Sequence, residues 1–206
     1  SLRSGSIYVG GGPRTADNKP GLRSDDGRAW TGGLVLRVGP DGHGLEALAH
    51  NFRNNYEVAL DSFGNMFLSD NDDDGNQSCR TTWVMEGGNY GYFSADGARY
   101  WSADRRPEQD TQRAHWHQDD PGVVPAGTIN GGGGPTGVCV YEGELLDAWV
   151  GGAVLNADAG RNVVYAHRPA PLGAGIALEP GWLIRTRPGA EGERVSWFRP
   201  SDVCVG

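Results

Sequence analysis

The stretch Phe52 to Ser69, FRNNYEVALDSFGNMFLS, decides the fold class of the chain. It reads as a short strand, a turn of the form D-x-x-G-N at residues 61–65, and a second short strand. Two such strands joined by a short glycine-containing turn form a β-hairpin. A hairpin is therefore the local unit from which the fold is predicted.

Parts of this hairpin recur along the chain. Three segments match one of its strands: residues 135–140 (PTGVCV), residues 200–205 (PSDVCV) and residues 5–10 (GSIYVG). With Val58, Val138 and Val203 as equivalent positions, the repeats lie 80 and 65 residues apart (138 − 58 and 203 − 138). These spacings exceed the roughly 40 to 50 residues of simple propeller repeats. The repeats therefore predict propeller blades with long loops.

The composition supports a fold made of many short strands. The 206 residues include 34 Gly, 12 Pro, 7 Trp and 7 Tyr, and 37% of them are hydrophobic, which is typical of a turn-rich globular β protein. We find no long amphipathic helix pattern. Further strands are predicted between the repeats, at residues 33–38, 80–86, 149–155, 161–166 and 194–198.

These patterns predict an all-β fold, a partial β-propeller of about three four-stranded blades. Residues 1–206 would form a single incomplete propeller domain, cut within blades at both ends, because a closed ring needs about four to eight blades. The chain opens on a second-strand pattern and stops at Gly206, where a turn should follow. A β-sandwich is the structural alternative.

Charge and cysteine content narrow the classes of partner. The net charge of −8 and the pI near 5 leave no basic patch for a nucleic acid or an anionic membrane surface. No run of about 18 apolar residues predicts a membrane span. Cys79, Cys139 and Cys204 lie far apart with no CxxC pair, so we expect free structural thiols.

The stretch SDNDDDGN, residues 69–76, packs four aspartates into five positions. Its D-x-D-x-D-G pattern turns alternate carboxylates inward on a tight loop, as calcium loops do. An EF-hand is excluded because Thr81 holds the position of its bidentate Glu. A metal-free, solvated acidic turn is the alternative to a structural calcium. The predicted ligands are the side chains of Asp70, Asp72 and Asp74, the backbone carbonyl of Asn76 and a water-mediated contact of Ser78.

Two further motifs have the residue types of a functional site. His115-Trp116-His117 puts two imidazoles on one face of an extended segment, which suits a transition metal or acid–base chemistry. No third ligand is evident, so an exposed aromatic loop is favoured. The GGGGP of residues 131–135 lacks the Gly-Lys-Ser/Thr ending of a phosphate loop and precedes a strand, so nucleotide binding is disfavoured.

Several phrases resemble one enzyme family in their order and spacing. They are IYVG at residues 7–10, GLVLRVGPDG at 33–42, FRN at 52–54 and GGNYGY at 87–92. In these phrases the chain is similar to quinoprotein dehydrogenases of the glucose/sorbosone type, which are six-bladed propellers that use pyrroloquinoline quinone (PQQ) and calcium. The resemblance therefore implies a six-bladed ring in the full-length protein.

Three later phrases resemble one branch of this family more closely. They are HWHQDDPGVVP at residues 115–125, PTGVCVYEG at 135–143 and NADAGRNVV at 156–164. The branch comprises large bacterial membrane-bound-dehydrogenase-like proteins, in which such a propeller precedes helical repeats and a haem-c domain. This sequence contains no C-x-x-C-H haem attachment motif, so the implied haem-c electron acceptor would lie in missing sequence.

The resemblance implies cofactor-binding residues position by position. Arg53 and Asn54 match an Arg-Asn pair that lies near the quinone in the family. Arg199 keeps the first arginine of an R-x-R pair, whose second position is Ser201 here. A guanidinium and an amide suit the carboxylates and carbonyls of the quinone. The implied PQQ-binding residues are therefore Arg53, Asn54 and Arg199.

Two expected functional residues have no counterpart in this sequence. The quinone-binding lysine expected near the end of the strand at residues 152–155 is missing, and Asp158 is the nearby charged residue. The catalytic histidine of the family lies on an earlier blade that this chain does not contain. The catalytic residue is therefore unknown.

The resemblance implies a bacterial oxidoreductase, exported to the periplasm or cell surface, that oxidises a sugar or alcohol. This chain would be its propeller portion, inactive alone. The implied partners are a sugar or alcohol substrate, the haem-c acceptor and a protein that covers open blade edges. The alternative, which Ser201 and Asp158 favour, is a non-catalytic propeller that serves as a carbohydrate- or protein-binding and assembly module.

Overall fold

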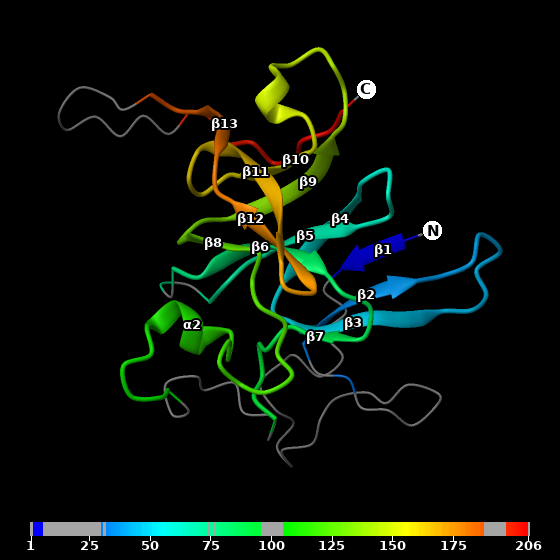
Figure 1. Cartoon of the computed structure of the whole chain (residues 1–206), viewed down its shortest axis with the longest axis vertical. Coiled ribbons are helices and arrows are strands. Elements are labelled where there is room, and N and C mark those ends of the chain that lie inside the picture. The colour runs from blue at the N-terminus through cyan, green and yellow to red at the C-terminus, as the bar shows by residue number, and fades with distance from the viewer. Residues whose placement is uncertain are drawn as a thin grey trace. The chain divides into compact units, whose positions relative to one another are not determined.

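The structure is a computed structural model of the chain and describes residues 2–5, 30, 32–73, 75, 77–95, 105–187 and 197–205. Strands dominate these residues (Figure 1). The helical elements are the short helix α2 (Thr111–His115) and the 3-10 turn η1 (Ala148–Val150). The strands are β1 (Leu2–Gly5), β2 (Gly33–Arg37), β3 (Glu46–Phe52), β4 (Asn55–Leu60), β5 (Met66–Asp70), β6 (Cys79–Val84), β7 (Gly88–Asn89), β8 (Thr128–Gly131), β9 (Pro135–Tyr141), β10 (Ala153–Asp158), β11 (Val163–Leu172), β12 (Gly175–Glu179) and β13 (Trp182–Arg185).

The strands form three sheets. Their strand orders are β1-β2-β3-β7, β4-β5-β6-β8 and β12-β11-β10-β9, with β13 paired to β11 as a fifth strand of the last sheet. The pairs β1–β2, β2–β3, β6–β8, β9–β10, β10–β11, β11–β12 and β11–β13 are antiparallel, whereas β3 and β7 are parallel. This is the all-β fold of a partial β-propeller, as the sequence predicts, because the first three strands of each sheet are consecutive neighbours in the chain.

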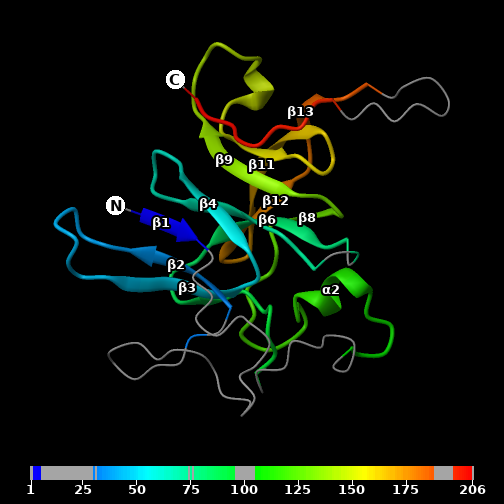
Figure 2. The same cartoon turned by 180° about the vertical axis from the view of Figure 1, so that it is seen from behind.

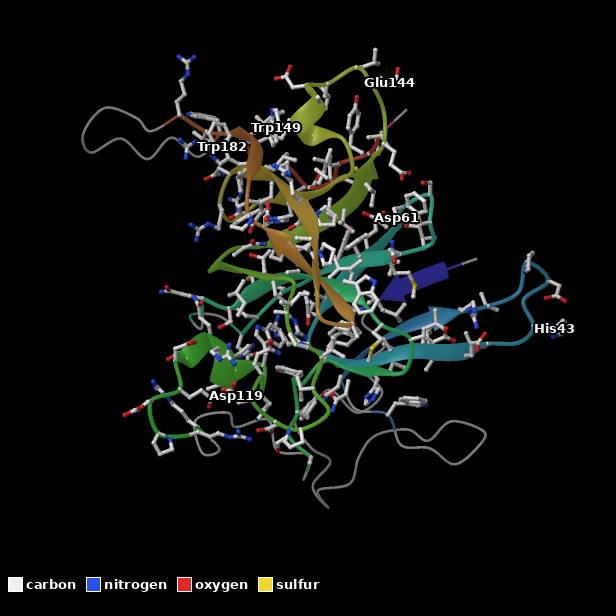
Figure 3. All side chains as sticks on the ribbon, in the orientation of Figure 1. His43, Asp61, Asp119, Glu144, Trp149 and Trp182 are labelled. Carbon is white, nitrogen blue, oxygen red and sulfur yellow. The ribbon has the colours of Figure 1, made fainter. Side chains whose placement is uncertain are left out.

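The hairpin of residues 52–69 is confirmed as β4, β5 and the turn between them. Asp61 Oδ1 accepts hydrogen bonds from the backbone N–H groups of Phe63 at 3.0 Å and Asn65 at 2.7 Å. Gly64 has a φ of +87°, a conformation that favours glycine. Figure 3 shows Asp61 at this turn and His43 at the turn between β2 and β3. The D-x-x-G-N sequence thus supplies local contacts for the turn, and the Ser62 N–H adds a hydrogen bond of 3.0 Å to the Glu142 carboxylate.

The chain divides into two compact units. The first unit comprises residues 1–55 and 84–126, and the second comprises residues 56–83 and 127–206. In the first unit, the rings of Phe52 and Tyr90 are fully buried and stack with their centroids 4.2 Å apart. Its helix α2 is capped by Asp110, whose side chain accepts a hydrogen bond from the backbone N–H of Arg113 at 2.8 Å.

The second unit has an apolar cluster on each face of the sheet that contains β9 and β10. Side chains alternate between the two faces along a strand. One cluster consists of Ala59, Phe67, Val138, Val140, Val154 and Leu178. The other consists of Tyr141, Val150, Ala153, Leu155, Val164 and Ala166, with Cys139, Leu183, Phe198 and Val203 packed against it. We call this second group the outer cluster.

Three predicted strands differ from the structure. The strand predicted at residues 149–155 begins only at Ala153, because residues 148–150 form η1 and Gly152 turns the chain with a φ of +76°. Residues 200–205 are not in a strand, although Val203 packs against the outer cluster. Of the strand predicted at residues 194–198, residues 197 and 198 are not in a strand, and residues 194–196 lie outside the described residues, as do residues 6–10 of the segment predicted at 5–10.

Among the described residues, no helix is long and apolar enough to cross a bilayer.

Candidate functional site at one end of the second unit

Polar residues gather where the strands of the second unit begin and end. β5 ends at Asp70 and β10 ends at Asp158, while β9 begins opposite Asp158, with which Pro135 pairs. β6 begins at Cys79, which pairs with the last residue of β8. The loops after β5, β8 and β10 therefore meet at this end, which we call the polar rim. Its described polar residues and glycines include Asp70, Asp72, Gln77, Ser78, Cys79, Arg80, Gly131 to Gly134, Asp158, Gly160 and Arg161.

Asp158 ties two loops of the polar rim together. Its side chain is fully buried, and its Oδ1 accepts hydrogen bonds from the backbone N–H groups of Gly134 at 2.8 Å, Gly160 at 3.0 Å and Arg161 at 3.0 Å. Within the described part of the chain, Oδ2 has no hydrogen-bond partner. Charge-assisted bonds of this kind are about twice as strong as neutral ones. The carboxylate therefore holds the loop after β8 against the turn after β10.

Glycines at the polar rim allow this close approach. A Cβ at Gly133 would lie 2.2 Å from Asp158 Oδ2, and a Cβ at Gly160 would lie 2.6 Å from the carbonyl carbon of Gly133. Both distances are far below van der Waals contact. Arg161 adds a hydrogen bond of 3.0 Å from Nη1 to the carbonyl of Gly132. The glycines of the GGGG sequence thus allow the backbone of the loop after β8 to contact the backbone of the turn after β10.

Asp70 forms a buried ion pair with Arg80. Arg80 Nη2 donates to Asp70 Oδ2 at 2.8 Å and Nε donates to the same oxygen at 3.2 Å. Both side chains are fully buried. Removing one partner of such a pair would leave an uncompensated buried charge, which is strongly destabilising. The pair therefore fixes β5 against β6.

Asp72 binds the residues that lead into β6. Its Oδ2 accepts from the backbone N–H of Ser78 at 2.5 Å, and its Oδ1 accepts from the Cys79 thiol at 3.0 Å. Burial, and then the hydrogen bond to Asp72, raise the pKa of the Cys79 thiol to about 12. Cys79 is thus a protonated thiol that donates a hydrogen bond at neutral pH.

The structure brings three of the five predicted calcium ligands close in space but gives them protein partners. Asp70 faces the Arg80 guanidinium, whose charge repels a cation, and Asp72 is bonded to the Ser78 backbone. Asp74 and Asn76 lie outside the described residues. Among the described His, Cys, Asp and Glu side chains, no group of three or more is placed to hold a metal ion. The calcium site stays a prediction.

The predicted cofactor-binding residues lie in both units. Arg53 and Asn54 form the half-buried bend between β3 and β4 in the first unit. Arg199 is exposed in residues 197–205 of the second unit. Their positions support no statement about a shared site, so quinone binding also stays a prediction.

A polar band that the sequence did not predict crosses the second unit. The Thr81 hydroxyl donates to Asn156 Oδ1 at 3.2 Å and accepts from Asn130 Nδ2 at 3.0 Å. Asn156 Nδ2 also donates to the carbonyl of Gly137 at 3.1 Å. Asn156 opposes Tyr165 in the register of β10 and β11, which puts both on one face of the sheet. The sequence signal that could have predicted this band is the alternation of polar residues within an apolar strand.

His167 continues this face of β11. Its side chain is fully buried and stacks on the Tyr165 ring with centroids 5.0 Å apart. Neither ring nitrogen has a hydrogen-bond partner among the described residues. Burial lowers the pKa of His167 to about 4 because the charged imidazolium is costly to desolvate. His167 is therefore neutral in the folded protein at neutral pH.

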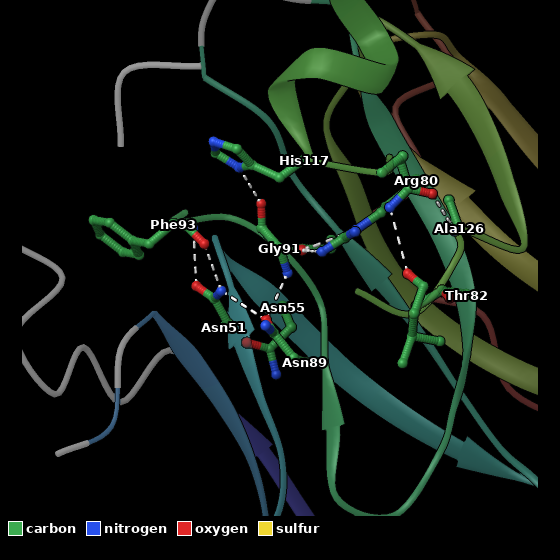
Figure 4. A network of polar contacts seen from close by, with 12 residues as sticks. Asn51, Asn55, Arg80, Thr82, Asn89, Gly91, Phe93, His117 and Ala126 are labelled. Carbon is green, nitrogen blue, oxygen red and sulfur yellow. Dashed lines mark hydrogen bonds and ion pairs between the residues drawn. The ribbon is translucent and has the colours of Figure 1, made fainter. Parts of the chain in front are cut away.

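Buried polar residues of the first unit form a hydrogen-bonded network (Figure 4). Asn51 Nδ2 donates to Asn89 Oδ1 at 2.7 Å and to the carbonyl of Phe93 at 2.8 Å, and its Oδ1 accepts from the Phe93 N–H at 2.9 Å. Asn89 Oδ1 also accepts from the Gly91 N–H at 3.0 Å. The GGNYGY phrase is thus a loop held by two asparagine side chains.

His117 joins this network, which corrects the expectation of an exposed aromatic loop. Its Nδ1 lies 2.6 Å from the carbonyl of Gly91, and because a carbonyl only accepts, Nδ1 carries the proton. His115, Trp116 and His117 are all at least 97% buried. The segment begins at the last residue of the short helix α2 and packs its rings inward, with the centroids of the Trp116 and His115 rings 4.4 Å apart. Local sequence could not show this burial.

Comparison with known proteins gives likeness only at the level of structure. No family model and no curated protein matches the chain. The putative oxidoreductase (glucose dehydrogenase) from Thermus thermophilus is 14% identical over 84% of this chain and 45% of that chain, with a TM-score of 0.53. At this identity, the likeness supports the fold alone.

Two other solved structures are similar at lower TM-scores. The PQQ-bound aldose sugar dehydrogenase from Streptomyces coelicolor is 17% identical over 74% of this chain and 39% of that chain, with a TM-score of 0.49. The apo-form of the soluble aldose sugar dehydrogenase from Escherichia coli is 12% identical over 73% and 44%, with a TM-score of 0.48. The chain thus spans less than half the length of these solved proteins.

Proposed function

We propose that the chain is the propeller portion of a quinoprotein-type sugar or alcohol dehydrogenase-like protein. The observation that carries this proposal is the polar rim, where loops at one end of a rigid β scaffold present charged and polar groups. A similar structure is described as a putative glucose dehydrogenase, which supports the same class of reaction. The whole protein would oxidise a sugar or alcohol carbon.

PQQ would be held by Arg53, Asn54 and Arg199. Guanidinium groups and an amide supply the donors that its carboxylates and carbonyls require. Arg53 is half-buried and Arg199 is exposed, so neither residue is fully enclosed by the described protein. When bound, the quinone supplies the oxidising group.

Binding of PQQ by the chain tests this proposal. Quenching of tryptophan fluorescence on titration with PQQ and calcium should give a saturable curve. Arg53→Ala is expected to weaken binding about tenfold to a hundredfold, because a hydrogen bond to a charged group contributes about 1.5–3 kcal/mol. Arg168→Ala removes an exposed arginine of β11 and is the matched control. Equal affinity of both variants and wild type would exclude Arg53 from the site.

The buried carboxylate of Asp158 favours a second candidate function. Asp158 lies near the position at which the resemblance implies a quinone-binding lysine. Its Oδ1 accepts hydrogen bonds from three backbone N–H groups. A negative charge there disfavours an anionic quinone. A non-catalytic propeller that binds carbohydrate or protein would not need the lysine. Failure of the folded chain to bind PQQ would support this candidate.

The acidic loop is proposed to bind a structural calcium through Asp72. Both Asp72 oxygens accept one hydrogen bond, and a carboxylate oxygen has a further lone pair for a cation. Asp70 is not needed as a direct ligand in this arrangement, because Arg80 already neutralises it. The predicted contributions of Asp74, Asn76 and Ser78 are unchanged.

Calcium should raise the melting temperature of wild type relative to a chelator, because a ligand that binds only the folded state stabilises it. Asp72→Ala is expected to remove that difference, measured by differential scanning fluorimetry. Comparing each variant with and without calcium separates ion binding from the lost bond to Ser78. Asp61→Ala, in the turn between β4 and β5, is the control. A wild-type melting temperature that calcium leaves unchanged would identify an ordinary solvated turn.

Location and partners follow from the proposed class. The protein would be exported to the periplasm or cell surface and would pass electrons to a haem-c domain outside this sequence. A protein partner would cover open blade surfaces. In the second unit, the exposed fractions of Leu145 and Trp197 are 96% and 92%, which supports an apolar contact of that kind.

A further inference from the structure

Residues 197–205 run alongside β9 in the same direction. Asn162 Nδ2 donates to the carbonyl of Phe198 at 2.6 Å, and Asn162 lies in the turn after β10, next to the start of β9. Four residues further on, Asp202 lies against Gly137 of β9, where a Cβ would be 2.8 Å from Asp202 Cα. Figures 1 and 2 both show the C-terminal end near the arrowhead of β9. The segment therefore contacts the β9 region at two points four residues apart.

This alignment brings two cysteines together. A Cβ at Gly137 would lie 1.9 Å from Asp202 Oδ1, so the Asp202 side chain points at β9. Cys139 and Cys204 lie two residues beyond Gly137 and Asp202, and both Cys139 and Val203 pack against the outer cluster. Cys204 and Asp202 are also among the neighbours that raise the pKa of Cys139. The two cysteines therefore lie on neighbouring stretches of chain.

We propose that Cys139 and Cys204 form a reversible disulfide that ties residues 197–205 to β9. The oxidant is a low-molecular-weight disulfide. The Cys204 thiolate attacks it, which releases one thiolate and leaves a mixed disulfide on Cys204. The Cys139 thiolate then displaces the second small thiol. The two protein thiols lose two protons and two electrons, and the small disulfide is reduced to two thiols.

Exposure and burial set the order of these steps. Cys204 is exposed and Cys139 is half-buried, so the oxidant reaches Cys204 first. Burial, and then the neighbouring Cys204, Glu57 and Asp202, raise the pKa of Cys139 to about 11. Closure of the disulfide is therefore faster at higher pH, because the thiolate is the nucleophile. Cys79 is buried in β6 and bonded to Asp72, which leaves it outside the reaction.

Peptide mapping of the oxidised chain tests the pairing. After incubation with oxidised glutathione at alkaline pH, the thiols that react in denaturant should fall from the three free cysteines to one. Trypsin places Cys139 in residues 114–161, Cys204 in 195–206 and Cys79 in 54–80. We expect a linked peptide of 114–161 with 195–206, and its loss after reduction. The urea midpoint of the oxidised chain should be higher than that of the reduced chain.

Variants and alternative products make the test decisive. Cys139→Ser should stop at the mixed disulfide on Cys204, and Cys204→Ser should stay reduced. Cys79→Ser should still form the linked peptide, and the wild-type map decides the pairing even if this variant does not fold. A stable mixed disulfide in wild type, a dimer linked through Cys204, or a link to residues 54–80 would each overturn the proposal.

Discussion

Asp158→Ala is expected to lower the free energy of unfolding by roughly 4 kcal/mol, because it removes three part-buried hydrogen bonds to a carboxylate, and hydrogen bonds to charged groups contribute about 1.5–3 kcal/mol each. The donors are the backbone N–H groups of Gly134, Gly160 and Arg161, from which Asp158 Oδ1 accepts at 2.8–3.0 Å. Urea unfolding followed by tryptophan fluorescence measures the loss. Asp158→Asn keeps an oxygen acceptor and should lose about half as much.

Gly133→Ala provides a second, independent measurement of the same contact. Its Cβ would lie 2.2 Å from Asp158 Oδ2, so the single variant should also be destabilised. In the Asp158→Ala background that clash is absent, and the cost of the alanine should be smaller. The double-mutant cycle should therefore show strong coupling. Additive effects, or a loss below about 1 kcal/mol for Asp158→Ala, would show that the carboxylate does not hold the loop.

His167 is expected to make the second unit less stable as the pH falls from 6.5 to about 4. The folded pKa lies below the ordinary value of 6.5, so the unfolded chain binds more protons in this range and the free energy of unfolding falls with pH. At ~1.4 kcal/mol for each pKa unit, the full loss is about 3 kcal/mol. This loss of stability is complete below the folded pKa and absent above pH 6.5.

Urea unfolding of wild type and His167→Phe at several pH values measures how much stability the protonation of His167 removes. The phenylalanine cannot be protonated, so the difference in slope between the two proteins isolates His167 from the carboxylates that also titrate in acid. His43→Ala, an exposed histidine in the turn between β2 and β3, should leave the slope unchanged. Parallel curves for wild type and His167→Phe would show that protonation of His167 does not oppose folding.

The polar rim connects these stability effects to the proposed function. Asp158 holds the glycine loop after β8, and any ligand of the rim would contact loops that this carboxylate orders. A dehydrogenase and a binding module use such loops equally well, since the rim fixes positions and the ligand is selected by the residues that line it. PQQ titration therefore distinguishes the two functions, whereas stability measurements do not.

Hydrogen-bond partners separate two aspartates that look alike in the sequence. Asp70 and Asp158 each end the second strand of a sheet and each is fully buried. Asp70 was predicted as a calcium ligand because it stands in an acidic cluster, and its partner is Arg80, ten residues away. Asp158 stands alone in the sequence and binds loop N–H groups up to 24 residues away. Spacing along the chain shows neither partner.

The sequence by itself determined the features that depend on neighbouring residues. The D-x-x-G-N turn, the strands β4, β5 and β9, and the all-β class follow from turn chemistry and short apolar runs, which act within a few residues. The tertiary structure alone decided the burial of His115 and His117, the neutral His167 and the contact of residues 197–205 with β9. These features arise where segments distant in the sequence pack together, and burial and desolvation depend on every atom around a group.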